Sequence, residues 1–259
     1  MVSQATLLII QMAGNAAITA GFAHLTHVKV GEYPEPIQLT RNPRREIAEA
    51  LLIWGIMFAS IFYLILAKFA FSWVYPSIVV SGFELTLHFF VELLFPVCFV
   101  VAFNKWRVED FGFRRPCARN PTIIAILYGV GWGAIPVLFG PVDPVPVTNL
   151  LFGVYSPAFI EEFVHRGIIQ AKLERGVGTV KAWVIGGILF GLMHVPTDFF
   201  GPIWYTGNQS LAYSFLAFGA QVAAGWLWGV IYAKTRSLLP VVISHYFADF
   251  MPGILSWLL

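Results

Sequence analysis

Charged residues are scarce in this chain. Only 12% of its 259 residues are Asp, Glu, Lys or Arg, about half the share in soluble domains, whereas 58% are hydrophobic. Several hydrophobic runs reach about eighteen residues, the length that predicts a membrane-spanning helix. The composition therefore excludes an ordinary soluble domain and predicts an all-α, polytopic membrane protein.

Cysteine is also scarce. Cys98 lies in an apolar run and Cys117 in a basic segment, so the two form neither a disulfide framework nor a paired metal motif. No internal repeat and no low-complexity segment is visible. The N-terminus lacks the basic region that precedes the apolar part of a signal peptide. We therefore expect the first hydrophobic segment to be a retained helix.

The apolar runs predict about eight membrane-spanning helices. These cover roughly residues 5–26, 48–67, 83–103, 121–140, 149–171, 181–196, 210–233 and 238–258. Lysines and arginines gather in every second connection, beginning with the one between the first two spans. Because such residues favour cytoplasmic loops, both termini are predicted to be non-cytoplasmic. The expected location is a multi-pass position in a membrane, the plasma membrane if the source is prokaryotic.

Four ionisable side chains lie within six residues of the fifth span: Glu161, Glu162, His165 and Arg166. A charge in hydrocarbon costs at least about 2.5 kcal/mol, so such a cluster indicates a functional site. Residues four apart share a helix face, which pairs Glu161 with His165 and Glu162 with Arg166. We interpret the second pair as a supporting ion pair and Glu161 as the carboxylate that faces another group. His165 is either the neighbour of Glu161 or a helix-packing residue.

Two later spans carry further polar residues, His194 in the sixth and His245 with Asp249 in the eighth. At a rise of about 1.5 Å per residue, these three residues and Glu161 reach the same mid-membrane level. The sequence therefore predicts a buried polar cavity built from three helices. A packing role for His194 is the alternative, since single histidines often form contacts between helices.

The third span contains a stripe of Glu84, His88 and Glu92 at spacings of four. Glu84 and His88 lie near the predicted outer interface, where water solvates them. We therefore interpret the stripe as an unlikely catalytic element.

The converging residues fit hydrolysis without a covalent intermediate. A desolvated glutamate beside a histidine can take a proton from water, and further hydrogen-bonding groups can stabilise the oxyanion. No nucleophile is favoured, because Ser244 points about 100° away from His245 on a helix and Cys98 has no visible base.

Zinc is the alternative to a metal-independent mechanism. Glu161, His165, His194 and His245 are all residues that zinc accepts as ligands. The H-E-x-x-H pattern of many zinc proteases is absent. We favour a glutamate-type mechanism without a cofactor and keep zinc at Glu161, His194 and His245 as the second choice.

Three motifs in order resemble the CPBP family of CAAX-processing and bacteriocin-processing enzymes, which includes the type II CAAX prenyl endopeptidases. The motifs are Glu161-Glu162-x-x-x-Arg166, Phe190-x-x-x-His194 and His245-x-x-x-Asp249. The segments 111–115 and 225–235 are similar to family sequences as well. The resemblance covers roughly 105–250. We therefore expect a catalytic core of five spans at 105–259 and three N-terminal spans at 1–104, in one integral membrane domain.

The resemblance implies an intramembrane protease. Glu161 would activate water with His194, His245 and Asp249 would bind the oxyanion, and Glu162 with Arg166 would support the site. The substrate would be a membrane-associated or lipidated peptide in the bilayer, with no nucleic-acid partner; the oligomeric state is not indicated. The chain departs from the family at two positions, with Asp249 where asparagine is frequent and His165 where an apolar residue is usual.

Two other functions use similar residues. Buried Glu and His side chains relay protons in transporters, but transporters often show internal repeats, and this sequence shows none. The other alternative is a non-catalytic membrane adaptor of the same family.

Overall fold

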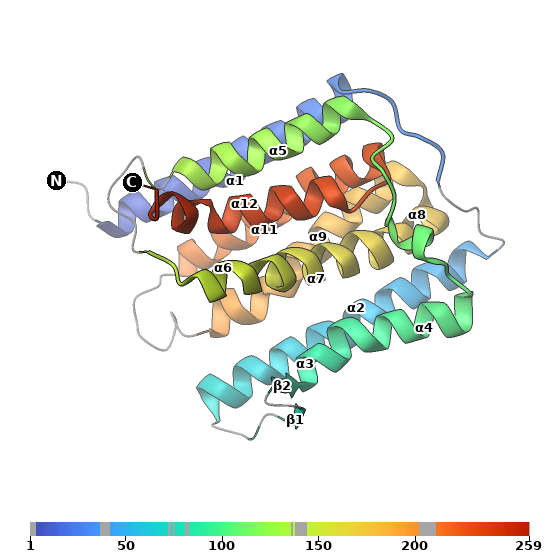
Figure 1. The fold of residues 1–259 in the computed structure, drawn as a ribbon, viewed down its shortest axis with the longest axis horizontal. Coiled ribbons are helices and arrows are strands. Elements are labelled where there is room, and N and C mark those ends of the chain that lie inside the picture. The colour runs from blue at the N-terminus through green and yellow to red at the C-terminus, as the bar shows by residue number, and fades with distance from the viewer. Residues whose placement is uncertain are drawn as a thin grey trace.

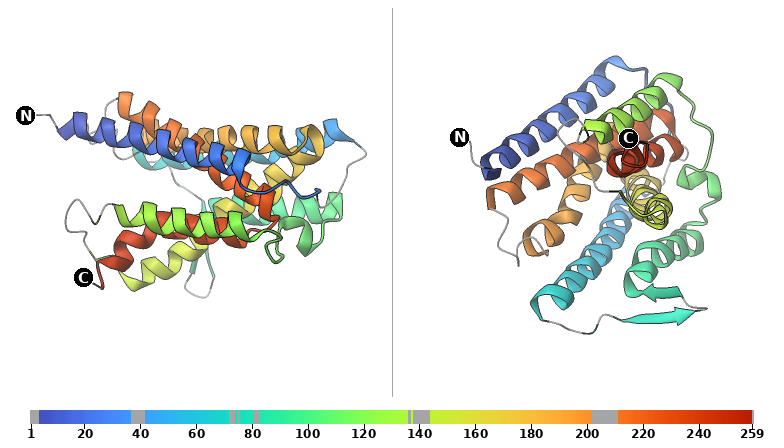
Figure 2. Two further views of the ribbon diagram at one scale, coloured as in Figure 1. Left: turned by 90° about the horizontal axis from the view of Figure 1, so that it is seen from above. Right: turned by 60° about the vertical axis from the view of Figure 1, so that its left-hand side comes forward.

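The computed structural model describes residues 4–36, 42–71, 74, 76–80, 83–135, 137, 144–201 and 211–258. Most of them lie in long helices that run side by side (Figures 1 and 2). The start of the first helix and the end of the last lie at the same end of the bundle (Figure 1). This is the arrangement that an even number of passes requires.

Each predicted span overlaps a helical segment. The long helices are α1 (Gln4–Lys29), α2 (Pro43–Ile65), α5 (Arg119–Ala134), α9 (Thr179–Phe200), α11 (Leu211–Thr235) and α12 (Leu239–Leu255). The third span contains α3 (Leu87–Phe89), a π-helical turn (Phe90–Leu94) and α4 (Phe95–Asn104). The fifth contains α6 (Val147–Gly153), α7 (Ile160–Glu162) and α8 (Ala171–Val177), joined by π-helical segments at Val154–Phe159 and Phe163–Gln170.

In the part of the chain that the structure describes, three helical segments are long and apolar enough to cross a membrane: Pro43–Phe69, Thr179–Phe200 and Leu211–Thr235. Shorter apolar helices cover Phe90–Asn104 and Leu239–Leu255. The predicted class, an all-α integral membrane protein, is confirmed. Eight passes with both termini outside remain a prediction.

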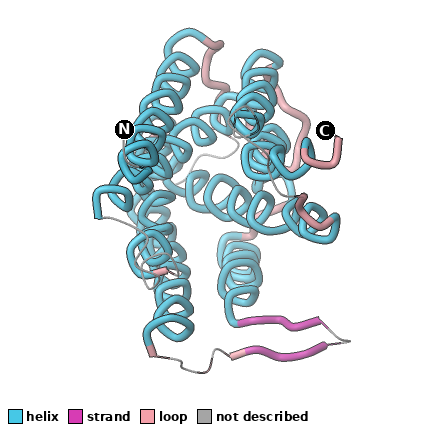
Figure 3. Tube along the Cα trace, turned by 90° about the vertical axis from the view of Figure 1, so that its left-hand side faces the viewer, coloured by secondary structure: helices cyan, strands magenta, loops and turns pink. Residues whose placement is uncertain are grey.

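Several predicted boundaries are displaced by a few residues; the fifth span, for example, continues to Val177. The third span begins with strand β2 (Phe83–Thr86), which pairs antiparallel with β1 (Ser77–Val80) in a small hairpin beside the helices (Figure 3). The β-branched residues of β1 favour a strand over a helix there. The sixth span continues to Phe200, past Pro196, because the helix tolerates this proline within its last turns. The side chains of Glu84 and His88 lie outside the described part.

The segment between α4 and α5 packs against the bundle through Phe111. It forms a 3₁₀ turn (Val108–Phe111) in which Phe111 is only 5% exposed and stacks on Phe163 at 5.4 Å. Gly112 follows with φ +86°, a conformation that favours glycine, and its carbonyl accepts the Leu238 N–H at 3.0 Å. The turn thereby holds the π-helical segment after Glu162 from one side.

The N-terminal helices are tied to the rest of the chain by polar contacts. The hydroxyls of Thr19 and Tyr128 lie 2.8 Å apart, and the Trp54 indole N–H donates to the Leu189 carbonyl at 2.9 Å. Lys234 Nζ donates to the carbonyl of Gly31 at 2.6 Å. Helices α1 and α2 therefore pack directly onto the segment expected to form the core.

Candidate active site

The helix that carries Glu161 is irregular on both sides of that residue. Ser156 has extended dihedrals (φ −138°, ψ 125°), which kink the helix five residues before Glu161. A π-helical segment begins at Phe163 and includes His165 and Arg166. Such π-helical turns occur often at functional sites. The apolar pattern predicts an uninterrupted span over 149–171, although Pro157 marks the kink in the sequence.

Glu161 faces His194, as predicted. Its carboxylate Oε2 lies 3.8 Å from His194 Nε2, and the two side chains are 31% and 22% exposed. The other ring nitrogen, Nδ1, lies 2.9 Å from the Phe190 carbonyl oxygen. Because a carbonyl can only accept, Nδ1 carries the hydrogen, and Nε2 is left to face the carboxylate. A gap of this length between two polar atoms is typical of a pair bridged by water.

Glu162 is completely enclosed and joins two of the other motif residues. Its Oε2 lies 3.1 Å from Arg166 Nε, which is the predicted ion pair. Its Oε1 lies 2.9 Å from His245 Nδ1, a contact that the sequence does not indicate. Glu162 therefore links the fifth span to α12 and holds the His245 ring.

His245 is bound by carboxylates at both nitrogens. Besides the Glu162 contact, its Nε2 lies 3.2 Å from Asp249 Oδ2. The Trp228 ring stacks on it at 4.1 Å with an interplanar angle of 17°, and the Trp228 N–H donates to Ser244 Oγ at 3.1 Å. In this arrangement both ring nitrogens of His245 are directed at carboxylates.

Phe190 is the centre around which the motif residues gather. Its ring contacts those of His165, His194 and His245, with centroid distances of 5.0, 4.8 and 6.3 Å. The Arg166 guanidinium carbon lies 4.8 Å from its centroid, within the range of a cation–π contact. The spacing of its motif identifies Phe190 as a neighbour of His194 but does not reveal these contacts.

Two cavities adjoin the site. One of about 230 Å³ is lined by the polar side chains of Glu92, Ser156, Glu161, His165, His194 and Thr197. Its apolar wall includes Met57, Ile61 and Met193. The other, of about 410 Å³, is lined by Asp249, Trp228, Tyr128 and Asp198 among others. Thr197 borders both cavities, with Glu161 and His194 on the first and Asp249 on the second.

Glu92 is the site residue that the sequence interpretation missed. It comes from the π-helical turn Phe90–Leu94, is 7% exposed and lines the cavity that contains Glu161. The signal was present in the stripe with Glu84 and His88, which we interpreted as facing the interface. Depth along a single helix cannot show which neighbouring helix a residue faces.

The donor atoms suit proton transfer better than metal binding. Among the described residues no group of three or more His, Cys, Asp or Glu side chains is arranged to hold a metal ion. His245 is engaged at both nitrogens and His194 at Nδ1. Of the predicted zinc ligands, only Glu161 and His194 direct polar atoms at each other, and two ligands do not complete the usual tetrahedral set.

A helical membrane protein that encloses a carboxylate and an imidazole beside a cavity has the parts of an intramembrane hydrolase. Residues 143–251 match the family described as "Type II CAAX prenyl endopeptidase Rce1-like". This segment, somewhat less than half of the chain, is similar to that family, and the predicted CPBP resemblance is confirmed. The match supports a CAAX-type intramembrane endopeptidase at family level, and that family acts on prenylated, membrane-associated substrates. No curated protein and no solved structure matches the chain.

Proposed function

We propose that this chain hydrolyses a peptide bond of a prenylated or otherwise membrane-associated peptide, with water activated by Glu161 and His194. The observation that carries the proposal is the Glu161 Oε2–His194 Nε2 approach of 3.8 Å at the wall of a cavity. The gap leaves room for one water held by both groups. The enclosed Glu162 has no such access, so the two adjacent glutamates differ in role.

The proposed reaction needs no covalent intermediate. The water bound by Glu161 and His194 gives a proton to the Glu161 carboxylate while its oxygen attacks the scissile carbonyl carbon. The C–N bond of the tetrahedral intermediate then breaks, and the proton on Glu161 passes to the departing amine nitrogen. The products are a new carboxylate and a new amine. Glu162 and Arg166 contribute by holding His245 and the surrounding rings in place.

The test is cleavage of a farnesylated CAAX peptide by the full-length protein in lipid nanodiscs, followed by mass spectrometry. Glu161→Gln keeps the size of the side chain but removes the base, so we expect at least a ~10³-fold loss of rate. Glu109→Gln is the matched control, because Glu109 is exposed in the turn before α5 and lies away from the cavity. Normal cleavage by Glu161→Gln would refute the proposal.

Two further arms separate the alternatives. A chelator that leaves the rate unchanged supports the glutamate-type mechanism, and loss of activity with recovery on added zinc supports the metal mechanism. If the peptide is bound but not cleaved by the wild type, and Glu161→Gln binds it equally well, the adaptor function is favoured. Proton flux in liposomes without hydrolysis would favour a transporter.

A further inference from the structure

One imidazole at the Glu161 cavity has no role in the reaction proposed above. His165 is only 2% exposed, and its ring nitrogen Nδ1 is enclosed without a hydrogen-bond partner. The residue nevertheless lines the cavity together with Glu161 and His194. A buried polar atom without a partner costs about 1–3 kcal/mol, so an aromatic residue such as phenylalanine would pack here at lower cost.

The other two imidazoles of the site are already engaged. His194 donates through Nδ1 to a backbone carbonyl and faces Glu161 with Nε2. His245 is bound at both nitrogens by Glu162 and Asp249. An oxyanion needs an N–H or O–H donor, and carboxylates do not supply one while ionised. Among the described imidazoles that contact Phe190, His165 alone is engaged neither by a carboxylate nor by the water of the proposed reaction.

The position of His165 suits a ligand in this cavity. It follows Glu161 by four residues, so the two side chains emerge on one side of the helix. Its ring packs edge-to-face on Phe190 at 5.0 Å and 79°, the same ring that His194 contacts. The charged and titratable groups around it are Glu161 and Arg166 on its own helix, His194 on α9, His245 on α12 and Glu92 on the third span.

We propose that His165 is a further catalytic residue, which donates a hydrogen bond from its imidazole to the oxyanion of the tetrahedral intermediate in the Glu161 cavity. The enclosed Nδ1 then remains without hydrogen, and Nε2 carries the donor. In this tautomer the unpaired Nδ1 is an acceptor, which is tolerated more readily in a protein interior than an unpaired N–H. The inference rests on the proposed endopeptidase activity and adds the donor that His245 does not provide in this arrangement.

The test compares His165→Phe with His165→Gln in cleavage of the farnesylated CAAX peptide. Phenylalanine keeps the ring contact with Phe190 and removes the donor, so we expect kcat to fall about 10²–10³-fold with KM within about threefold. Glutamine offers an amide N–H and should recover at least about tenfold of that loss. His24→Phe is the matched control, since His24 is an exposed histidine of α1 that lines neither cavity. We expect that variant to retain wild-type kcat.

A binding measurement separates the donor role from packing. A farnesylated peptide with a phosphinate at the scissile position mimics the tetrahedral intermediate, and its affinity is compared with that of the substrate peptide in the Glu161→Gln background. We expect His165→Phe to weaken phosphinate binding about 10²-fold and to leave substrate binding unchanged. Equal loss for both ligands, a change confined to KM, or unchanged kcat in His165→Phe would overturn the inference. If the wild type neither cleaves the peptide nor binds the phosphinate more tightly than the substrate, the proposed function itself fails, and the inference fails with it.

Discussion

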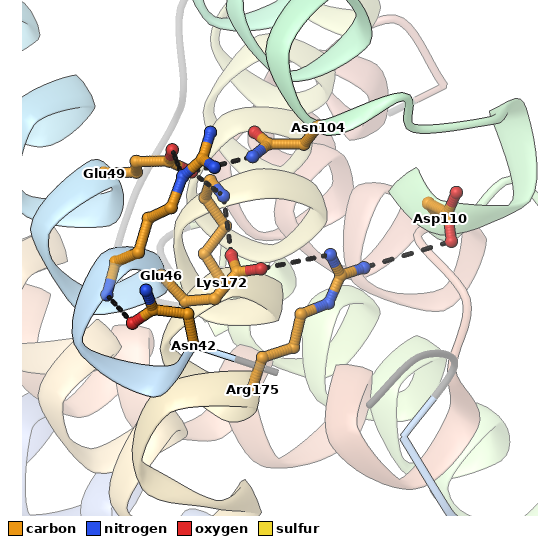
Figure 4. A network of polar contacts seen from close by, with 8 residues as sticks. Asn42, Glu46, Glu49, Asn104, Asp110, Lys172 and Arg175 are labelled. Atoms are coloured by element: carbon orange, nitrogen blue, oxygen red, sulfur yellow. Dashed lines mark hydrogen bonds and ion pairs between the residues drawn. The ribbon is translucent and has the colours of Figure 1, made fainter. Parts of the chain in front are cut away.

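Among the described residues, two of the buried groups of charged side chains are built in opposite ways. At the end of the bundle where α2 begins, Lys172 Nζ lies 2.6 Å from carboxylate oxygens of both Glu46 and Glu49 (Figure 4). Asn104 Nδ2 donates to the same Glu49 oxygen at 2.9 Å. At the candidate active site, Glu161 and His194 approach only to 3.8 Å. We call the first group the Lys172 network.

The difference in distance follows a difference in surroundings. Residues of the Lys172 network line neither of the two cavities beside Glu161, and Lys172 itself is fully buried. Their charges are satisfied by one another, as a stable interior requires. Glu161 and His194 keep exposed atoms at the wall of a cavity. Short, closed contacts thus indicate a role in stability, whereas a longer contact beside a cavity indicates a place for a substrate.

Glu162→Gln should have the largest combined effect on stability and activity. The reason is that Glu162 has the closed contacts of the Lys172 network and also belongs to the candidate active site. It is enclosed like Lys172, yet it holds the His245 ring at 2.9 Å. Loss of its charge leaves Arg166 buried without a carboxylate, which costs about 3–5 kcal/mol. Displacement of the site should also lower kcat at least about tenfold. Denaturant unfolding in detergent and peptide cleavage measure the two effects.

For Glu162→Gln the control is Glu109→Gln, which removes a carboxylate from an exposed position. A variant that loses activity but keeps its full free energy of unfolding would show that Glu162 belongs with the catalytic group alone. The Lys172 network and the active-site group would then differ in function more clearly than their contacts suggest.

Lys172→Met should affect stability alone. Methionine keeps much of the apolar stem but leaves Glu46 and Glu49 without the cation between them, so we expect a loss of about 3–5 kcal/mol. The rate of peptide cleavage per folded molecule should stay within about twofold of wild type, since Lys172 lines neither cavity. Lys105→Met, at an exposed position, is the control. Adding Glu46→Gln to Lys172→Met should recover part of the loss, and no recovery would contradict the assigned network.

The sequence predicts the helices of this fold better than it predicts their contacts. Hydrophobic length and periodicity locate each helical segment, because burial in lipid acts on a helix as a whole. The spacing of four also predicts the Glu162–Arg166 pair, which lies within one helix. The contact of Glu162 with His245 joins two helices, and no local pattern records which helix lies opposite. The same reason explains why Glu92 was missed and why the gathering of three imidazoles around Phe190 was not foreseen.

For charged residues outside the site, too, the sequence does not predict contacts between helices. Glu49 could be interpreted from the sequence only as an anion near a helix start, where the helix dipole favours it. In the structure it also binds Lys172 from α8 and Asn104 from α4. For Lys172 the sequence predicts only a place in the lysine- and arginine-rich loop between the fifth and sixth spans. Whether a charge near a helix end is solvated or enclosed depends on the packing of helices distant in sequence.

Arg45→Ala should have the smallest effect, although its ion pair is short. Arg45 Nε lies 2.7 Å from Glu49 Oε1, but the arginine side chain is 55% exposed, so water and salt screen the attraction. Its backbone N–H donates to the Asn42 side chain at 3.1 Å, and alanine preserves this cap of α2. The other Glu49 oxygen keeps Lys172 and Asn104 as partners. We therefore expect the midpoint of denaturant unfolding to coincide with that of the wild type at both low and high salt. Arg45→Ala could instead lose as much stability as Lys172→Met. In that case the length of an ion pair, and not its burial, would decide how much it contributes to the free energy of unfolding. The burial of Lys172 would then no longer explain why the Lys172 network stabilises the bundle.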